Sequence, residues 1–291
     1  SAKAMQAAVE AFTADPTDAT LAAAKQAWLG ARGDYGLTEA FRFYGGPIDN
    51  EEGGPEGLIN AWPLDEAYID YVEGNPTAGI VNDVATYPEI TSEVLTTANE
   101  EGGETNISTG WHAVEFLLWG QDLSTTGPGA RPFTDYTTEP NAERRTTYLT
   151  TVIDELISNL TTVTDAWDPA GTDNYRTEFL ALPTDESLTD IITGIGELGR
   201  GELAGERMLV AYDERDQENE HSCFSDNTLA DIEANERGIA NVWTGEYPGA
   251  SDGPGLVELV GSVDTDLASK TTDAIDAVLA EIAEIPAPFD S

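Results

Sequence analysis

The sequence predicts an all-α protein, built from two helical-bundle domains that pack together. Along most of the 291 residues, apolar side chains recur at spacings of three and four, and the alternation typical of β-strands is nearly absent. Three of these periodic stretches are long, as in four-helix-bundle-like domains. A hydrophobic fraction of 40% with six Trp residues is enough for a large core, and the length fits one or two domains.

The first half of the chain carries the shorter predicted helices. We expect helices over residues 4–12, 17–43, 64–72, 89–100 and 108–119. Between them lie two long irregular stretches. Residues 45–61 are rich in Gly and acids, and residues 121–140 contain the run Gly127-Pro128-Gly129-Ala130-Arg131-Pro132. Loops of that length in a compact helical protein are functional more often than average, and a disordered connector is the alternative.

The second half carries the long predicted helices. They cover residues 141–167, 187–213 and 256–285. Five glycines interrupt residues 187–213, and each costs about 1 kcal/mol relative to alanine, so we expect a neighbouring backbone to approach closely there. The loop at residues 121–140 is the natural boundary between an N-terminal domain, 1–140, and a C-terminal domain, 141–291.

The chain is strongly acidic. Acidic residues number 55 against 13 basic ones, which gives a formal net charge of −42 at pH 7. Nucleic acid and anionic lipid surfaces are therefore excluded as partners, because both repel such a chain. The acids are spread along the whole chain, which favours a solvated acidic surface over a clustered cation-binding region. Salt relieves self-repulsion on this scale, so we expect a marine or high-salt source.

No apolar run approaches the roughly 18–20 residues that span a bilayer, so we expect no transmembrane segment in this sequence. The sequence opens at Ser1 in an apparent helix, and we expect an export signal or lipoprotein leader to have been removed. Cys223 is the only cysteine, which excludes an internal disulfide. It is more typical of a small buried hydrophobe than of a nucleophile.

The apolar segment 110–119 contains one of the two histidines, His112, three residues before Glu115. On a helix this spacing puts both side chains on one face, within reach of one ion or one proton. The other residues are apolar nearly all round, so the helix is expected to be buried. Its N-terminus disfavours a charged imidazole and leaves a neutral ring able to bind a metal. The alternative is a His–Glu hydrogen bond that only fixes helix packing.

His221, the second histidine, lies in a polar run over residues 213–226. A solvated loop or a frayed helix end is the ordinary interpretation of so polar a segment. A new helix is expected to follow, with Ser225 or Asp226 as its N-cap. Acidic residues are so common in this chain that their density around His221 does not by itself indicate a site.

Two further pairs combine an acid with an arginine. Glu206 shares a helical stripe with other acids and has Arg207 beside it, an arrangement that is costly to bury unless the charges are paired or ligated. Glu39 and Arg42 lie one helical turn apart in the first half of the chain. Their ordinary interpretation is a surface ion pair of little energetic value.

Several segments match one known family in order along the chain. The segments are 31–44 (ARGDYGLTEAFRFY), 59–70 (INAWPLDEAYID), the motif Gly110-x-His112-x-x-Glu115, 131–136 (RPFTDY), 202–208 (ELAGERM) and 220–228 (EHSCFSDNT). Together they resemble the imelysin family, which includes M75-type peptidases and iron-regulated proteins. The resemblance covers residues 24–245 and is far more specific than the short motif alone.

The resemblance implies two helical bundles, export to the periplasm or cell surface, and a link to iron acquisition, with outer-membrane or surface uptake proteins as partners. The family's Gly-x-His-x-x-Glu motif marks a site that transfers here to Gly110, His112 and Glu115. The same segments supply candidates for binding the ligand or orienting the site: Glu39, Arg42, Arg131, Asp135, Glu206, Arg207 and His221.

Two functions follow from these residues. In the first, a non-catalytic protein binds iron, with zinc as the alternative metal, through His112 and Glu115, since mixed nitrogen and oxygen donors suit such metals. The arginines favour an anionic ligand or a chelated ferric complex over a bare ion. In the second, the same pair serves an M75-type metallopeptidase. We favour binding, because the chain lacks the two-histidine zinc motif of such hydrolases. A purely structural interaction module is the third alternative.

The net charge makes a prediction about stability in salt. Raising NaCl to about 1 M shortens the screening length to roughly 3 Å. We therefore expect the Tm, followed by circular dichroism, to rise by several degrees between dilute buffer and this concentration. A Tm that stays level or falls would contradict the destabilising role given to charge repulsion.

Overall fold

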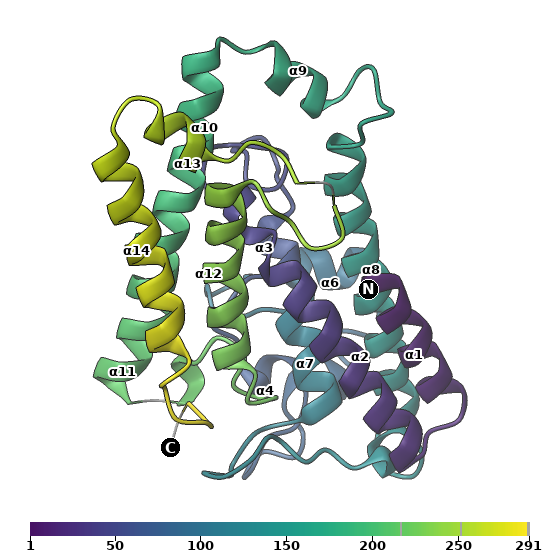
Figure 1. The fold of residues 1–291 in the computed structure, drawn as a ribbon. Coiled ribbons are helices and arrows are strands. Elements are labelled where there is room, and N and C mark those ends of the chain that lie inside the picture. The colour runs from purple at the N-terminus through teal and green to yellow at the C-terminus, as the bar shows by residue number, and fades with distance from the viewer. Residues whose placement is uncertain (216, 251, 290–291) are drawn as a thin grey trace.

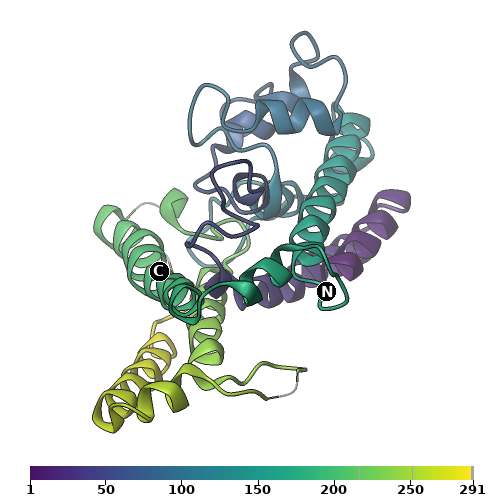
Figure 2. The same cartoon turned by 90° about the horizontal axis from the view of Figure 1, so that it is seen from above.

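The computed structural model describes residues 1–215, 217–250 and 252–289. Within these ranges the protein is all-α, as predicted, and its one β-type pairing is an isolated bridge between Val72 and Asn75. No helix in the same ranges is long and apolar enough to cross a membrane. The helices form two groups, which lie side by side in both views (Figures 1 and 2).

The first group is built around one buried helix. Its members are α1 (Ala2–Ala14), α2 (Asp18–Gly36), α7 (Gly110–Trp119) and α8 (Ala142–Ala166). A capping box between Thr17 and Thr20 starts α2, and Gly120, with a φ of 73°, ends α7. Because α2 and α8 pack against α7, all ten of its residues are buried, which confirms the prediction for this segment.

Short helices connect α2 to α7, and some of them pack along α8 (Figure 2). They are η1 (Glu39–Phe41), α3 (Glu56–Ile59), α4 (Glu66–Ile69), α5 (Gly79–Asn82) and α6 (Ser92–Ala98). The helix predicted over residues 17–43 is wrong beyond Gly36, where the chain turns into η1 and carries Glu39 into the interior. The helices predicted at 64–72 and 89–100 are also shorter than expected.

The second group follows α8 in the sequence. It contains α9 (Tyr175–Ala181), α10 (Thr184–Glu197), the π-helix η3 (Leu198–Leu209), α11 (Val210–Glu214), η4 (Gln217–Asn219), α12 (Thr228–Thr244), α13 (Leu256–Gly261) and α14 (Thr265–Ile282). The single helix predicted over residues 256–285 is wrong, because Asp264 caps a new start by accepting a hydrogen bond from the Leu267 N–H. Helices α10, η3 and α11 run on from one another, as predicted for 187–213, but twelve residues wind as a π-helix.

The expected domain boundary falls in the loop that contains η2 (Phe133–Tyr136). Helix α8 follows this boundary, yet it packs on α1 and α7 and shares their core. The chain therefore passes from the first group of helices to the second between α8 and α10, later than residue 140. The division into domains 1–140 and 141–291 stays a prediction.

One glycine brings two elements into backbone contact. A Cβ at Gly194 would lie 2.7 Å from the carbonyl oxygen of Ala40 and 2.9 Å from that of Arg42. The close approach expected for the five glycines of this segment is therefore found at Gly194. It allows α10 to hold η1 in place, whereas Gly196, on the same helix, faces open space.

These two glycines make a matched pair for mutagenesis. We expect Gly194→Ala to lower the free energy of unfolding by about 1–3 kcal/mol, because the backbone of η1 must move. Gly196→Ala should raise it by up to about 1 kcal/mol through helix propensity alone. Urea unfolding of both variants measures the difference, and the same sign of change in both would contradict the packing role of Gly194.

Candidate functional site

His112 and Glu115 form a buried hydrogen-bonded pair on α7. Their side chains are 1% and 0% exposed, and His112 Nδ1 lies 3.0 Å from Glu115 Oε2. The backbone N–H and the hydroxyl of Ser225 both donate to Glu115 Oε1, at 2.9 and 2.7 Å. The spacing of three residues therefore brings the two side chains together, as predicted.

Both members of this pair are uncharged at neutral pH. Burial raises the pKa of Glu115 to about 8. Burial and the positive charge of Arg32 hold the pKa of His112 well below its usual range. The ring is neutral, as predicted, but the cause is desolvation rather than the helix terminus. Among the described residues, His112 Nε2 is one of the few buried side-chain nitrogens without a hydrogen-bond partner.

His221 lies directly beside His112, with 4.8 Å between the ring centroids. It is buried in the turn before α12, so the solvated loop expected there is wrong. The ring packs edge-on against Trp62, whose Nε1 donates to the carbonyl oxygen of Glu220 at 2.7 Å. The indole of Trp62 therefore covers the segment around His221, which its polar sequence predicts to be exposed to solvent.

Arg32 of α2 and Asp231 of α12 both contact the ring of His221 and pair with each other. Arg32 Nε is 3.1 Å from Asp231 Oδ2, and Arg32 Nη2 lies 3.2 Å from both ring nitrogens of His221. Asp231 Oδ2 also lies 2.9 Å from His221 Nδ1. Burial would raise the pKa of Asp231, but Arg32 together with the hydrogen bonds from His221 and Ser222 lowers that pKa to about 2. Burial, together with Arg207 and Arg32, lowers the pKa of His221 to about 3.

Glu39 is the centre of a second set of buried charges. It accepts two hydrogen bonds from Arg207 of η3, at 3.1 and 2.7 Å, and one from Arg42 at 3.0 Å. Asn235 of α12 donates to Glu39 at 3.1 Å. Glu39 is 1% exposed and Arg42 6%, so the expected surface ion pair is wrong, because the turn after α2 directs both residues inward.

Asn60 joins the two sets into one. It accepts a hydrogen bond from Arg32 and donates to Glu39 Oε2 at 3.3 Å. We call the connected residues the interface network, since they come from both groups of helices. Its members are Arg32, Glu39, Arg42, Asn60, Arg207, His221, Asp231 and Asn235. The His112–Glu115 pair adjoins it through the contact between the two imidazole rings.

Two predicted site residues belong to a separate cluster. Arg131 donates to Asp70 at 2.7 Å and to Asp135 at 3.0 Å, and Arg145 also binds Asp70. This cluster fastens the loop 121–140 to α4 and α8. Within the described part of the chain, no hydrogen bond or ion pair joins it to His112. Glu206, another predicted member, is exposed on η3. Its neighbour Glu202 lies nearer the network, 3.8 Å from Arg207 Nη2.

Sequence reasoning missed four central residues, Arg32, Asn60, Asp231 and Asn235. A signal for the last two exists: with Thr228 they repeat at spacings of three and four along one face of α12, so a polar stripe faces inward. Across the described ranges, no group of three or more His, Cys, Asp or Glu side chains is arranged to hold a metal ion. The arrangement in this conformation is a closed, charge-compensated network with one free imidazole nitrogen.

The sequence matches the imelysin family over residues 1–291. The chain belongs to the imelysin family. It is 27% identical over 251 residues to iron-regulated protein A of Synechococcus elongatus, covering 83% of this chain and 58% of that protein. This imelysin thus spans less than two thirds of the curated relative that it matches.

A solved structure supports the imelysin fold. It is assigned as an iron-regulated protein A precursor from Parabacteroides distasonis and aligns with a TM-score of 0.72 at 20% identity. The alignment covers 99% of this chain and 80% of that one. The arrangement of helices described above is therefore that of a solved relative.

The buried Glu115 makes a prediction about pH. Its pKa is about 8 in the folded protein against an ordinary value of 4.5, so the folded state holds a proton that the unfolded chain releases between these values. The stability that this proton contributes is lost as pH rises through about 8. We expect the Tm of the wild type to fall, relative to that of the non-titrating Glu115→Gln variant, as pH is raised across this window.

Differential scanning calorimetry at several pH values measures the effect, with exposed Glu93→Gln as the matched control. The control should keep a constant offset from the wild type. A constant offset for Glu115→Gln as well would show that Glu115 is already ionised in the folded protein.

Proposed function

We propose that this imelysin is an exported, non-catalytic binding protein of iron acquisition, and that iron or an iron-bearing ligand binds at His112. The names of its relatives supply the iron context. Iron-regulated protein A is the matched protein in Synechococcus elongatus, and the similar solved structure is assigned as a precursor of such a protein. The word precursor also supports export, and uptake proteins of the periplasm or cell surface would be the partners.

One observation carries the proposed site, the unpartnered His112 Nε2 in a fully buried position. Imidazole nitrogen is an ordinary iron ligand, and a ligating ring is usually oriented by a carboxylate on its other nitrogen. Glu115 has this relation to His112, because it binds Nδ1 and is itself held by Ser225. In the proposal His112 contacts the metal and Glu115 orients the ring, in place of the joint ligation expected from the motif.

The charges near His112 favour iron that arrives with anionic groups. Arg32 adjoins His221, and its charge is already balanced by Asp231, so this carboxylate is not free to offset a bare cation beside the ring. Binding at Nε2 displaces one proton from the His112–Glu115 pair and leaves the pair with one negative charge. A chelated ion would bring the remaining oxygen ligands with it.

Burial favours binding over the peptidase alternative. A peptide substrate needs a surface cleft, whereas His112 and Glu115 are 1% and 0% exposed, and both oxygens of Glu115 are engaged. A small iron chelate needs far less space than an extended peptide. Its entry requires only that the interface network opens between the two groups of helices.

Metal content tests the proposal. Protein loaded with Fe(II) or ferric citrate and then desalted should retain roughly stoichiometric iron by mass spectrometry, and His112→Ala should lose it. Asp135→Asn is the matched control, since it alters a buried carboxylate in the separate cluster around Asp70 and should keep the iron.

Retention of iron by folded His112→Ala, or no iron in the wild type, would overturn the proposed site. Zinc loading under the same conditions tests the alternative metal. Chelator-sensitive cleavage of casein that is absent from Glu115→Ala would favour the peptidase instead.

A further inference from the structure

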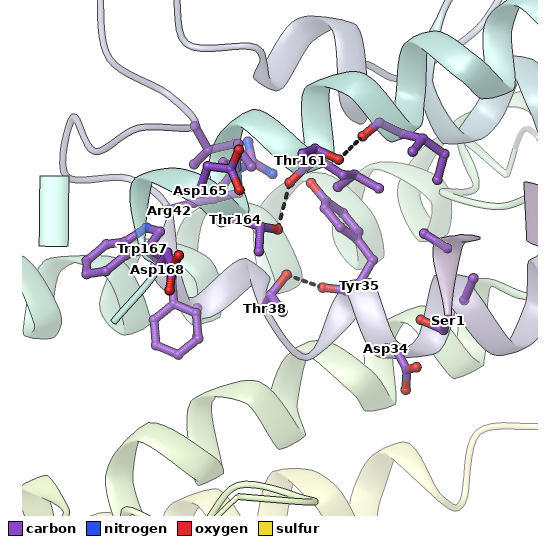
Figure 3. Close-up of a pocket in the computed structure, with 18 of the residues that line it drawn as sticks. Ser1, Asp34, Tyr35, Thr38, Arg42, Thr161, Thr164, Asp165, Trp167 and Asp168 are labelled. Carbon is purple, nitrogen blue, oxygen red and sulfur yellow. Dashed lines mark hydrogen bonds between the residues drawn. The ribbon is translucent and has the colours of Figure 1, made fainter. Parts of the chain in front are cut away.

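A large groove lies between α2, η1 and the C-terminal half of α8. Its volume is about 1000 Å³, and most of its wall is aromatic or aliphatic. Tyr44, Phe179 and Trp167 form one end through successive ring contacts, with centroids 6.2 and 5.5 Å apart. Figure 3 shows Tyr35 extending from α2 toward Thr161 and Thr164 on α8. The volume is at the upper end of the range that holds small organic ligands.

Three side chains of this wall each keep one hydrogen-bond donor unused. Among the residues that the structure describes, the hydroxyl of Tyr35, Nε1 of Trp111 and Nε of Arg42 are buried without a partner. The three residues are 7%, 0% and 6% exposed. Leaving a buried donor unsatisfied is costly, and such groups are few in folded proteins. Three around one groove indicate acceptors that a bound molecule supplies.

The charges of the wall do not favour an anion. Arg42 is already paired with Glu39 at 3.0 Å and with Glu56 at 2.9 Å, so only its Nε remains. Three acidic residues, Asp34, Asp165 and Asp168, also line the groove and outnumber its one lysine, Lys3. Burial raises the pKa of Tyr35 far above its ordinary value, so its hydroxyl stays a donor at any physiological pH. The unused groups are thus donors in surroundings that repel negative charge.

We propose that this groove binds an uncharged, largely apolar molecule that carries carbonyl or ether oxygens. The apolar body packs on the aromatic wall, and the oxygens accept hydrogen bonds from Tyr35, Trp111 and Arg42. Trp111 precedes His112 in the chain, but the binding described here uses no metal and does not depend on iron at His112.

Nile red is a suitable probe, because it is uncharged, apolar and carries a carbonyl oxygen. Its fluorescence should rise on binding and fall when 2-undecanone competes for the groove. Decanoate, an anion, and decyltrimethylammonium, a cation, have similar chain lengths and should compete at least tenfold less well. Equal competition by all three would show that only apolar area is recognised, and preference for either ion would contradict the charge argument.

Tyr35→Phe removes one unused donor and keeps the ring. We expect it to weaken displacement by 2-undecanone roughly threefold to tenfold, the equivalent of one hydrogen bond. The Tm should stay level or rise, because the wild-type hydroxyl is unsatisfied. Tyr212→Phe, at a tyrosine 70% exposed and outside the groove, is the matched control and should change neither value. A lower Tm with unchanged affinity in Tyr35→Phe would mean that the hydroxyl has a structural partner, and would overturn the proposal.

Discussion

Charges buried between two groups of helices are the constraint on which this structure depends. Arg32, Glu39, Arg207 and Asp231 are each at most 2% exposed, and each is compensated by a residue from another element. Removing one partner of such a pair costs about 3–5 kcal/mol, because the other charge is left buried and alone. The pairs therefore specify how α2, η3 and α12 meet more strongly than apolar contacts alone could. Asn60 adds an uncharged link between the Arg32–Asp231 pair and the Glu39–Arg207 pair, because it hydrogen-bonds to both Arg32 and Glu39.

The same network explains the state of the imidazole rings. Arg32 and burial together keep both histidines neutral, and the apolar helix α7 places His112 where water cannot replace a missing hydrogen bond. The neutral ring of His112 has Nδ1 hydrogen-bonded and Nε2 free, so Nε2 is the atom available to a ligand. The large groove has the same feature, because hydrogen-bond donors without partners lie in its mostly apolar wall. In both cases an unsatisfied buried group identifies the candidate site, whereas the density of charged residues does not.

Periodicity and turn residues were sufficient to predict the all-α class, the buried segment 110–119 and the long helix over residues 141–167, which is α8. These signals gave wrong predictions of burial where contacts between distant parts of the chain determine it. Glu39 and Arg42 have the spacing of an exposed helical pair, and only the turn after Gly36 brings them inside. His221 lies in a polar run, yet Trp62, far away in the sequence, covers it. The site residues inferred from the family segments divide in the same way: Glu39, Arg42, Arg207 and His221 meet at the network, while Arg131 and Asp135 stabilise a loop. Local sequence cannot show which ion pairs share a neighbourhood.

The network also has a consequence for synthesis of the chain. Arg32 pairs with a residue 199 positions later, and Glu39 with one 168 positions later. At ordinary elongation rates the ribosome needs roughly ten seconds or more to reach those partners. Until then the N-terminal helices can collapse with α8, but Arg32 lacks Asp231, and Glu39 has only one of its two arginine partners, Arg42. These charges must therefore stay hydrated. The first group of helices therefore completes its packing only when α12 arrives, so the nascent chain is committed late to its native state.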